Sequence, residues 1–386
     1  MTAADSPRPT RLAIVGASAR AAAFSALEAG FDVVTADLFA DADLAARCDA
    51  TRIDNYPEGL ADWLAEQDVD AWMYTGALEN HPELVDRMAE IRPLWGNRGE
   101  PLRRCRDPME LQRLCREVGV MFPETRTSPK GLPLDGSWLC KTYRGACGSG
   151  VWALDGEAAL ARAVAAGAYF QRLVSGVSAA AVCLLLGRRV SRLEGLTEQL
   201  IGLHAFGAQP WAHCGSIARP DWRSPKEAHG GVASVLALGC GLKGLVGVDL
   251  VIDGDEHWFL EANPRFPASA EVAESRRPRG TVSGNAIAYG WTAPNRTSQR
   301  TLYPLAGKAI VYAKSDLAID AKFHSWAMGE AASGRLADVP HAGTSIAIGH
   351  PVCTLLEPPP TDDVLERLEA RAADVYRRLA DCRVSG

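Results

Sequence analysis

Residues 246–266 read VGVDLVIDGDEHWFLEANPRF. Two apolar runs flank an acidic turn that contains a glycine, and this pattern predicts two antiparallel strands joined as a β-hairpin. Pairing across the turn brings Asp249 near Glu261 and Asn263. Because Glu261 and Asn263 are two positions apart, they share one face of their strand. Carboxylate and amide oxygens gathered in this way suit Mg²⁺, which also keeps phosphate oxygens and water as ligands.

A second informative stretch is WLCKTYRGACGSGV at residues 138–151, a strand that delivers Lys141 into a loop with three glycines. Backbone N–H groups of such a loop can close over phosphate oxygens, and an ammonium group at the strand end supplies a fixed positive charge. Each feature has a structural alternative when taken alone, because turns also need glycine and strand acids also cap turns. The combination of both stretches favours a nucleotide site.

These two stretches, together with Arg265 after Asn-Pro, resemble the ATP-grasp superfamily of ATP-dependent carboxylate–amine or carboxylate–thiol ligases. The resemblance covers roughly residues 10–290, and the segment 169–176 is similar to the strand that reads adenine in that family. It implies an α/β plus α+β fold class. From the resemblance we expect a Rossmann-like N-terminal domain followed by an ATP-grasp fold, in which two antiparallel sheets sandwich ATP.

The resemblance also implies a role for each matched residue. Lys141 and Arg265 are the expected catalytic residues. The expected ligands of one or two Mg²⁺ ions are Asp249, Glu261 and Asn263. The residues expected to bind ATP are Lys141, Arg144, Gly145, Gly148, Ser149, Gly150, Gln171, Arg172, Leu173, Val174 and Ser178.

The activity implied is that of an ADP-forming ligase, which activates a small carboxylate as an acyl phosphate and couples it to an amine. Amino-acid or glutamate ligation in cofactor biosynthesis is one option within that class. Three departures from the family stand out, and one of them is Arg172, which follows Gln171 where many relatives carry an acid. Arg104 or Arg106 stands where the family carries a further ATP-binding lysine, and arginine does not replace lysine in every role. Ser178 stands where a ribose-binding acid is common.

Two other functions stay open at this stage. One is an ATP-binding regulatory or scaffold protein that has lost turnover. The other is an NAD-dependent oxidoreductase that uses the N-terminal domain, where Asp37 follows the first turn at the distance of a ribose-binding acid. The turn itself, GASAR at residues 16–20, departs from the dinucleotide-binding glycine pattern, which disfavours the second option.

Alternating strand and helix patterns predict a Rossmann-like domain over residues 1–100. We expect the ATP-grasp domain over 101–293, with a lid subdomain at about 137–176, and a C-terminal α/β appendage over 294–386. That appendage is predicted to hold a β-hairpin within 344–356 and a final amphipathic helix after Thr361. It resembles the additional module of the tyramine–glutamate ligase-like branch.

The composition excludes several classes. The chain has 386 residues and a net charge of -6, so no basic field is available for a phosphate backbone and nucleic acid is not an expected partner. No apolar run reaches the roughly 20 residues of a membrane span and no signal pattern begins the chain, so we expect a cytoplasmic protein without a membrane partner. The 10 cysteines form no Cys-x-x-Cys pair and are predicted to be reduced. The expected partners are the carboxylate and amine substrates, and a homodimer stays open.

Overall fold

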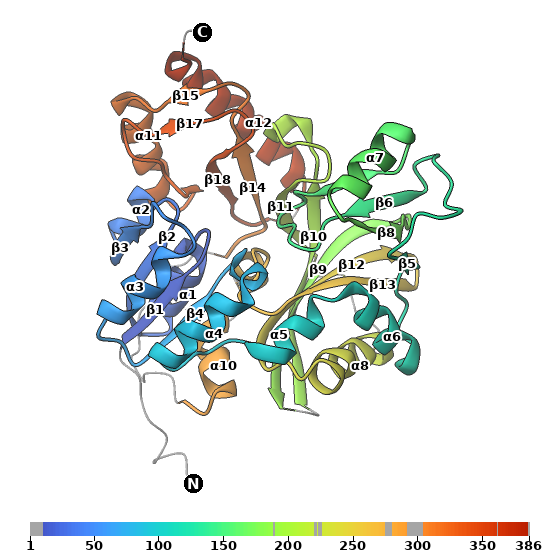
Figure 1. Ribbon diagram of the computed structural model, residues 1–386. Coiled ribbons are helices and arrows are strands. Elements are labelled where there is room, and N and C mark those ends of the chain that lie inside the picture. The colour runs from blue at the N-terminus through green and yellow to red at the C-terminus, as the bar shows by residue number, and fades with distance from the viewer. Residues whose placement is uncertain are drawn as a thin grey trace.

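The computed structural model describes residues 11–187, 190–219, 222, 226–274, 280–291, 304–360 and 362–384. Its strands form two four-stranded sheets, one eight-stranded sheet and one two-stranded sheet (Figure 1). The N-terminal sheet lies at one side of the molecule, and the large sheet crosses its centre. Helix α11 (Ala321–Ala332) of the C-terminal segment lies beside α2 (Ala42–Ala45) of the N-terminal domain, although the two helices are far apart in sequence.

The N-terminal sheet is parallel, with the strand order β3-β2-β1-β4. Strands β1 and β4 read as nearly continuous apolar runs because helices cover both faces of the sheet, and every residue of β4 is buried. This arrangement confirms the predicted Rossmann-like unit. The strands are β1 (Arg11–Val15), β2 (Asp32–Asp37), β3 (Asp49–Arg52) and β4 (Ala71–Tyr74). The helices are α1 (Arg20–Glu28), α2 (Ala42–Ala45), α3 (Gly59–Glu66) and α4 (Pro82–Ile91), and η1 (Leu78–Asn80) is a 3₁₀ turn after β4.

The second four-stranded sheet is antiparallel and small, with the order β5-β8-β6-β7. It has a hydrophobic core of its own, built from Trp138, Trp152 and Phe170 with helix α7 packed on one side. Its elements are β5 (Thr125–Arg126), β6 (Trp138–Lys141), β7 (Val151–Ala153), α7 (Glu157–Ala165) and β8 (Tyr169–Arg172).

The large sheet is antiparallel, with the order β13-β12-β9-β10-β11-β14-β18-β16. Its central strands are β9 (Val177–Gly187), β10 (Val190–Ile201), β11 (His213–Ala218), β12 (Gly244–Asp253) and β13 (Glu256–Asn263). The C-terminal segment adds β14 (Gly307–Tyr312), β16 (Leu336–Ala337) and β18 (Pro351–Glu357) to it. The α-helices around the central strands are α5 (Gly99–Cys105), α6 (Pro108–Val118), α8 (Lys226–Ser234), α9 (Ala270–Ala273) and α10 (Gly280–Ala288). A 3₁₀ turn, η2 (His204–Phe206), follows β10, and a π-helical segment, η3 (Val235–Gly239), follows α8.

The hairpin expected within residues 344–356 does not form. Strand β17 (Ser345–Ile346) pairs with β15 (Leu317–Ala318), whereas β18 pairs with β14 and β16. Six of the seven residues of β18 are buried. Inside the large sheet both faces of the strand are covered, whereas in an isolated hairpin one face would be exposed to solvent. Helices α11 (Ala321–Ala332) and α12 (Val364–Arg378) and the 3₁₀ turn η5 (Leu379–Cys382) complete this segment. Thr361, after which the final helix was predicted, lies outside the described residues, as does the predicted domain boundary at 293–294.

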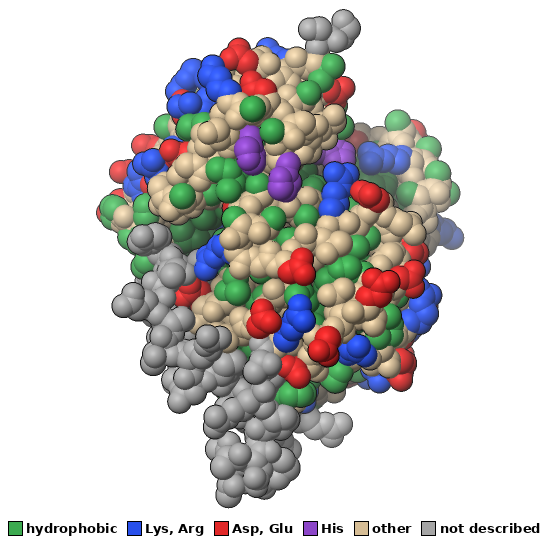
Figure 2. Space-filling model, turned by 90° about the vertical axis from the view of Figure 1, so that its left-hand side faces the viewer, with side chains coloured by type: hydrophobic (Ala, Val, Ile, Leu, Met, Phe, Trp, Pro, Cys, Tyr) green, Lys and Arg blue, Asp and Glu red, His purple; other side chains and the backbone are tan. Residues whose placement is uncertain are grey.

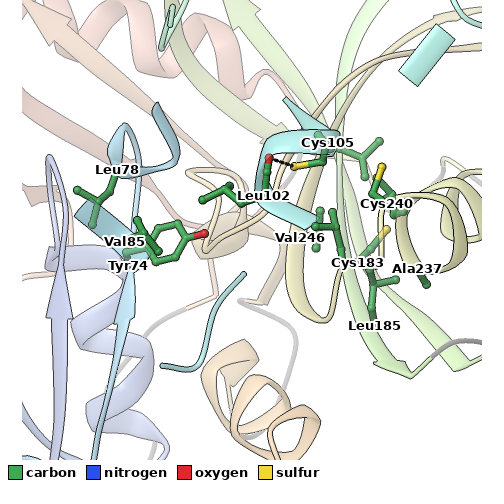
Figure 3. Packing of buried hydrophobic residues seen from close by; sticks show 14 of the residues in the cluster. Tyr74, Leu78, Val85, Leu102, Cys105, Cys183, Leu185, Ala237, Cys240 and Val246 are labelled. Atoms are coloured by element: carbon green, nitrogen blue, oxygen red, sulfur yellow. Dashed lines mark hydrogen bonds between the residues drawn. The ribbon is translucent and has the colours of Figure 1, made fainter. Parts of the chain in front are cut away.

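One hydrophobic cluster joins the N-terminal sheet to the large sheet. Figure 3 shows Tyr74, Leu78 and Val85 on one side of Leu102 and Cys105, with Cys183 and Val246 on the other. The Cys105 thiol donates to the carbonyl of Leu102 over 3.2 Å. All 10 cysteines are free, as predicted, and eight of them are buried. This continuous core fixes the position of the N-terminal loops relative to the large sheet.

Among the described helices, none has both the length and the apolar character that a membrane span requires. On the face seen in Figure 2, basic and acidic side chains are interspersed over the described surface.

Candidate active site

A cavity of about 710 Å³ lies between the small sheet and the large sheet. Residues from the small sheet, the glycine loop, strands β12 and β13, and the N-terminal domain line it. The structure brings nearly all the predicted site residues to this one space, although they are spread from position 141 to position 265. The exceptions are Arg144 and Gly150, which do not line the cavity.

Two carboxylates face each other on one wall of the cavity. Asp249 of β12 and Glu261 of β13 are direct cross-strand partners, as the hairpin pattern predicts. Asp249 accepts hydrogen bonds from Gln199 Nε2 over 3.0 Å and from Asn263 Nδ2 over 3.1 Å. Burial, followed by the charge of Glu261, raises the pKa of Asp249 to about 7. Burial opposes the charge of Glu261, but Lys141 and Arg106 hold its pKa below the usual value.

This donor set fits a hard divalent cation. Two close carboxylates that repel one another gain from a cation between them, and the carbonyl oxygen of the Asn263 side chain adds a neutral oxygen donor. Within the described residues, no group of three or more His, Cys, Asp and Glu side chains is arranged for a metal. A cation held by Asp249, Glu261 and Asn263 would therefore need oxygen ligands from phosphate and water, which is the usual state of Mg²⁺ beside a nucleotide.

The Lys141 ammonium group is held in place by the small sheet. Its Nζ donates to Gln171 Oε1 over 3.1 Å, and Gln171 Nε2 donates to Thr125 Oγ1 over 3.2 Å. Burial disfavours the charged lysine, yet Tyr169, Glu261 and Asp249 raise its pKa overall. The result is a fixed cation at the end of β6, facing the two carboxylates across the cavity.

The glycine loop between β6 and β7 lies over the cavity in a conformation that requires glycine. Gly148 has φ +81°, and a Cβ atom added there would lie 1.8 Å from the carbonyl oxygen of Trp211. Gly150 has φ +79°, and its Cβ atom would meet the Thr142 hydroxyl at 2.1 Å. The backbone N–H of His213 donates to the carbonyl of Cys147 over 3.2 Å. The loop is thus docked on the segment before β11.

Arg106, one of the two arginines considered as a replacement for a lysine, lies in the cavity wall. Asp107 caps α6 by accepting from the N–H groups of Met109 and Glu110, and this fixes the start of the helix beside the cavity. Arg106 lines the cavity and donates from Nη2 to Asn80 Oδ1 over 3.0 Å. Its buried Nε has no hydrogen-bond partner among the described residues.

Arg104 points elsewhere. Its Nε and Nη2 donate to Glu110 Oε1 over 3.2 and 2.6 Å, and it does not line the cavity. Of the two arginines left open by the sequence, the geometry therefore selects Arg106 as the cavity cation.

The segment 171–174 lines the cavity, but two of its backbone N–H groups already donate hydrogen bonds to other parts of the protein. The N–H of Arg172 donates to the Glu124 carbonyl over 2.8 Å, and the N–H of Leu173 donates to the Ser137 carbonyl over 2.9 Å. The side chain of Gln171 supports Lys141. Any purine edge bound here would have to use other backbone groups of this segment. Ser178 also lines the cavity.

The Asp37 carboxylate, considered as a ribose-binding acid, already accepts hydrogen bonds from the protein backbone. Asp37 is buried, and its carboxylate accepts hydrogen bonds from the N–H groups of Ala19, Phe39 and Ala40 over 2.7 to 2.9 Å. The carboxylate therefore organises the loop after β1 and is not presented to a ribose. This observation removes the main support for a nicotinamide site.

The sequence of the central part matches a known family. Residues 105–269 fit the family description "ATP-grasp domain". The chain contains an ATP-grasp domain. The match covers the small sheet and the central strands of the large sheet, so both walls of the cavity belong to the ATP-grasp domain. No curated protein gave a significant sequence match.

Solved structures with an ATP-grasp arrangement cover nearly the whole chain. L-amino acid ligase from Bacillus licheniformis has a TM-score of 0.65 at 14% identity, with 95% of this chain and 98% of the ligase covered. N5-carboxyaminoimidazole ribonucleotide synthetase from Thermus thermophilus has a TM-score of 0.60 at 17% identity, with 95% and 98% covered. The biotin carboxylase domain of 2-oxoglutarate carboxylase from Hydrogenobacter thermophilus, solved with MgADP, ADP and bicarbonate, has a TM-score of 0.62 at 16% identity, with 98% and 91% covered. These identities show a shared fold, which extends from the N-terminal parallel sheet to the antiparallel sheets.

The N-terminal domain adds residues to the ATP-grasp cavity that the sequence analysis missed. Glu79 of η1 lines the cavity and forms a salt bridge with Arg265, 2.9 Å from Oε1 to Nη2. Asn80 donates from Nδ2 to the carbonyl of Arg144 over 3.1 Å and so contacts the glycine loop. The signal in the sequence was weak, because both residues follow β4 in a loop with no recognisable pattern. Only their position at the end of a parallel strand could have indicated a site.

Proposed function

We propose that the protein is an ATP- and Mg²⁺-dependent, ADP-forming ligase that activates a small carboxylate as an acyl phosphate and couples it to an amine. The proposal is carried by one observation: Lys141, the Asp249–Glu261 pair and Arg265 line a single cavity beneath the glycine loop. Fixed cations, carboxylates for a divalent ion and a loop that covers phosphate are the parts that phosphoryl transfer needs.

In the proposed reaction, a substrate carboxylate oxygen attacks the γ-phosphorus of ATP, and the bond from that phosphorus to the β,γ-bridging oxygen breaks to release ADP. The amine then forms a bond to the acyl carbon, phosphate leaves with the electron pair of the C–O bond, and the amine loses a proton. Lys141 and Arg106 bind the phosphate oxygens, and Arg265 balances negative charge near the reacting carboxylate. The glycine loop excludes water, which would otherwise hydrolyse the acyl phosphate.

Asp249, Glu261 and Asn263 would hold Mg²⁺, whose charge helps to neutralise the phosphates when it is bound. The protein supports this ligand set with Gln199, which orients the Asp249 carboxylate through the hydrogen bond to Oδ1.

The structural neighbours make a carboxylate–amine ligation reasonable and leave the substrates open. One neighbour is an L-amino acid ligase, and another is a ribonucleotide synthetase whose name indicates a carboxyamino product. Amino acids, including glutamate, are therefore the first carboxylates and amines that we would supply.

Thermal unfolding of the purified chain with MgATP, MgADP, ATP plus chelator, or NAD tests the nucleotide site. A ligand at 100 times its dissociation constant stabilises the folded state by about 2.7 kcal/mol, so binding gives a clear rise in Tm. We expect a rise with MgATP and MgADP, a smaller rise with chelator and none with NAD. A rise with NAD alone would contradict the proposal.

Turnover is then tested by ADP release with pairs of amino acids, and with hydroxylamine to trap an acyl phosphate as a hydroxamate. We expect hydroxamate only when ATP, Mg²⁺ and the correct carboxylate are all present. Nucleotide binding without ADP release from any pair would favour the ATP-binding scaffold function instead.

A further inference from the structure

The side chain of Asn80 joins three separate elements beside the cavity. Its Nδ2 group donates to the carbonyls of Arg144 and Gly145 in the glycine loop, over 3.1 and 3.4 Å. Its Oδ1 accepts from Arg106 Nη2 over 3.0 Å. The amide can bind these partners in one orientation only, because a carbonyl accepts and a guanidinium group donates. Asn80 is 8% exposed and does not line the cavity, so it acts on neighbouring groups and not on a substrate.

The turn that carries Asn80 is fixed by its own residues. Ala77 begins the turn with φ +73°, a left-handed conformation that is uncommon for alanine. Such a conformation persists only where the surrounding structure holds it. Leu78 is fully buried in the cluster that joins the N-terminal sheet to the large sheet (Figure 3), and the N–H of Asn80 donates to the Ala77 carbonyl over 3.1 Å. The amide of Asn80 is therefore presented to the loop from a well-supported position.

The glycine loop is attached to the rest of the protein on two sides. On the side of the N-terminal domain, Asn80 holds the carbonyls of Arg144 and Gly145. On the side of the large sheet, the N–H of His213 holds the carbonyl of Cys147. A loop bound in this way can uncover the cavity only after one of the two attachments breaks.

We infer that Asn80 is a positioning residue, which holds the glycine loop closed over the cavity and orients the Arg106 guanidinium group toward a bound phosphate. The inference rests on the proposed function, in which Arg106 binds phosphate and the loop excludes water. It gives the N-terminal domain control over the cover of the ATP-grasp cavity. Because one amide serves both groups, its loss releases the loop and removes the support of Arg106 at the same time.

Limited digestion of the full chain with trypsin tests the attachment directly. The Arg144 side chain is exposed, but the carbonyl of its bond to Gly145 is the group that Asn80 holds, so trypsin can cut there only after the loop is released. Lys130 and Gly131, both exposed in the loop between β5 and β6, provide a reference bond in the same molecule. Mass spectrometry would follow both cuts. In the unmodified protein we expect cleavage after Arg144 to be at least about tenfold slower than after Lys130, because its rate follows the population of the released loop.

Asn80→Asp is the most informative variant. Its carboxylate still accepts from Arg106, but it sets a charged oxygen against the two loop carbonyls where the N–H donors stood. Cleavage after Arg144 should become about tenfold faster, as the loss of two hydrogen bonds predicts, and cleavage after Lys130 should not change. Asn80→Ala, which removes the contacts to the loop and to Arg106 together, should release the loop as well.

Asn285→Asp is the matched control. Asn285 is 2% exposed and does not line the cavity. Its Nδ2 donates to the Trp95 carbonyl over 3.1 Å, and its Oδ1 accepts from the N–H of Leu245 over 2.9 Å. Loss of this buried amide reports general loosening of the fold, so it should leave the ratio of the two cleavage rates unchanged.

Turnover measurements separate the two roles of the amide. In Asn80→Asp the contact to Arg106 remains, so the main change should be a several-fold rise in the share of ADP formed without ligated product. In Asn80→Ala the guanidinium group also loses its support, so the KM for ATP should rise by about fivefold.

Equal cleavage after Arg144 and Lys130 in the unmodified protein would overturn the inference even if no Asn80 variant folded. The same Arg144 cleavage rate in Asn80→Asp and the unmodified protein would overturn it too, as would unchanged coupling in both variants. No ADP release from any substrate pair would overturn the proposed function, whereas the cleavage ratios would still decide whether Asn80 holds the loop.

Discussion

Asp249 and Glu261 are paired directly across strands β12 and β13, and the repulsion between their buried carboxylates helps to raise the pKa of Asp249 to about 7. The hairpin thus holds two acids in an arrangement that favours one proton or one cation between them. The hydrogen bonds from Gln199 and Asn263 keep Asp249 in place in either state.

The variant Glu261→Gln should abolish Mg²⁺-dependent ADP formation while the fold is retained. The amide removes one of two negative charges that attract the cation, and losses of roughly 100-fold or more are typical when a preorganised charge contact is removed. ADP release and far-ultraviolet circular dichroism would be measured together. Glu256→Gln, at the exposed start of the same strand, is the control and should keep full activity. Equal ADP release by Glu261→Gln and the unmodified protein would remove Glu261 from the metal site.

Mg²⁺ affinity should depend on pH between about 5.5 and 7 and level off above that range. Below a pKa of about 7, Asp249 is protonated, and the proton must leave before the carboxylate can bind a cation. The apparent affinity should therefore fall by up to about tenfold for each pH unit below 7. Titration calorimetry with Mg²⁺ and ADP in buffers of different ionisation enthalpy would measure the proton released. An affinity that stays constant across this range would contradict the coupling of the two acids.

Arg106→Ala should weaken MgATP binding by about tenfold, whereas Arg104→Ala should leave it unchanged. Arg106 lines the cavity with an unpartnered Nε, but Arg104 is paired with Glu110 outside it. Loss of one charge-assisted contact to phosphate corresponds to about a factor of ten in affinity. Equilibrium binding of a fluorescent ATP analogue would compare the two variants, and a larger loss for Arg104→Ala would reverse the assignment.

Local patterns carried most of the information about the site. The acidic hairpin and the lysine strand with its glycine loop are each continuous in sequence, so their geometry follows from residues close together in the chain. Glu79 and Asn80 were missed because they reach the cavity only through the packing of one domain on another. Strand β10 has no clear strand pattern in the sequence, because Arg192, Glu194 and Glu198 interrupt its apolar residues, although Glu194 becomes buried beside Arg192. Strand β17 pairs with β15 and strand β18 pairs with β14 and β16, and no local pattern describes these pairings between distant segments.

Gly148→Ala should lower turnover strongly and leave the stability of the rest of the protein nearly unchanged. The new Cβ atom would overlap the Trp211 carbonyl, and φ at this position is +81°, where alanine is strained. The loop would have to leave its docked position over the cavity. We expect slower ADP release, and a larger share of that ADP should be formed without ligated product because water hydrolyses the acyl phosphate. Gly329→Ala in α11 provides a comparison, because no atom lies near its added Cβ and its φ is not positive. Normal coupling in Gly148→Ala would show that the docked loop is not needed for turnover.

Glu274→Gln should stabilise the protein at pH 7 to 8 and have little effect near pH 5. Burial raises the pKa of Glu274 to about 7, although Thr281 and Ser25 donate to its Oε2. The folded state therefore holds a proton that the unfolded chain releases near its usual pKa of about 4.5, so the folded state binds more protons between those values. Stability must fall as pH rises through this window, and a neutral amide removes that loss. Urea unfolding of both proteins at several pH values would show a difference that grows with pH. The exposed Glu366→Gln should show no such trend. A difference in Glu274→Gln that stays flat or shrinks as pH rises would mean that the carboxylate is accommodated as an anion.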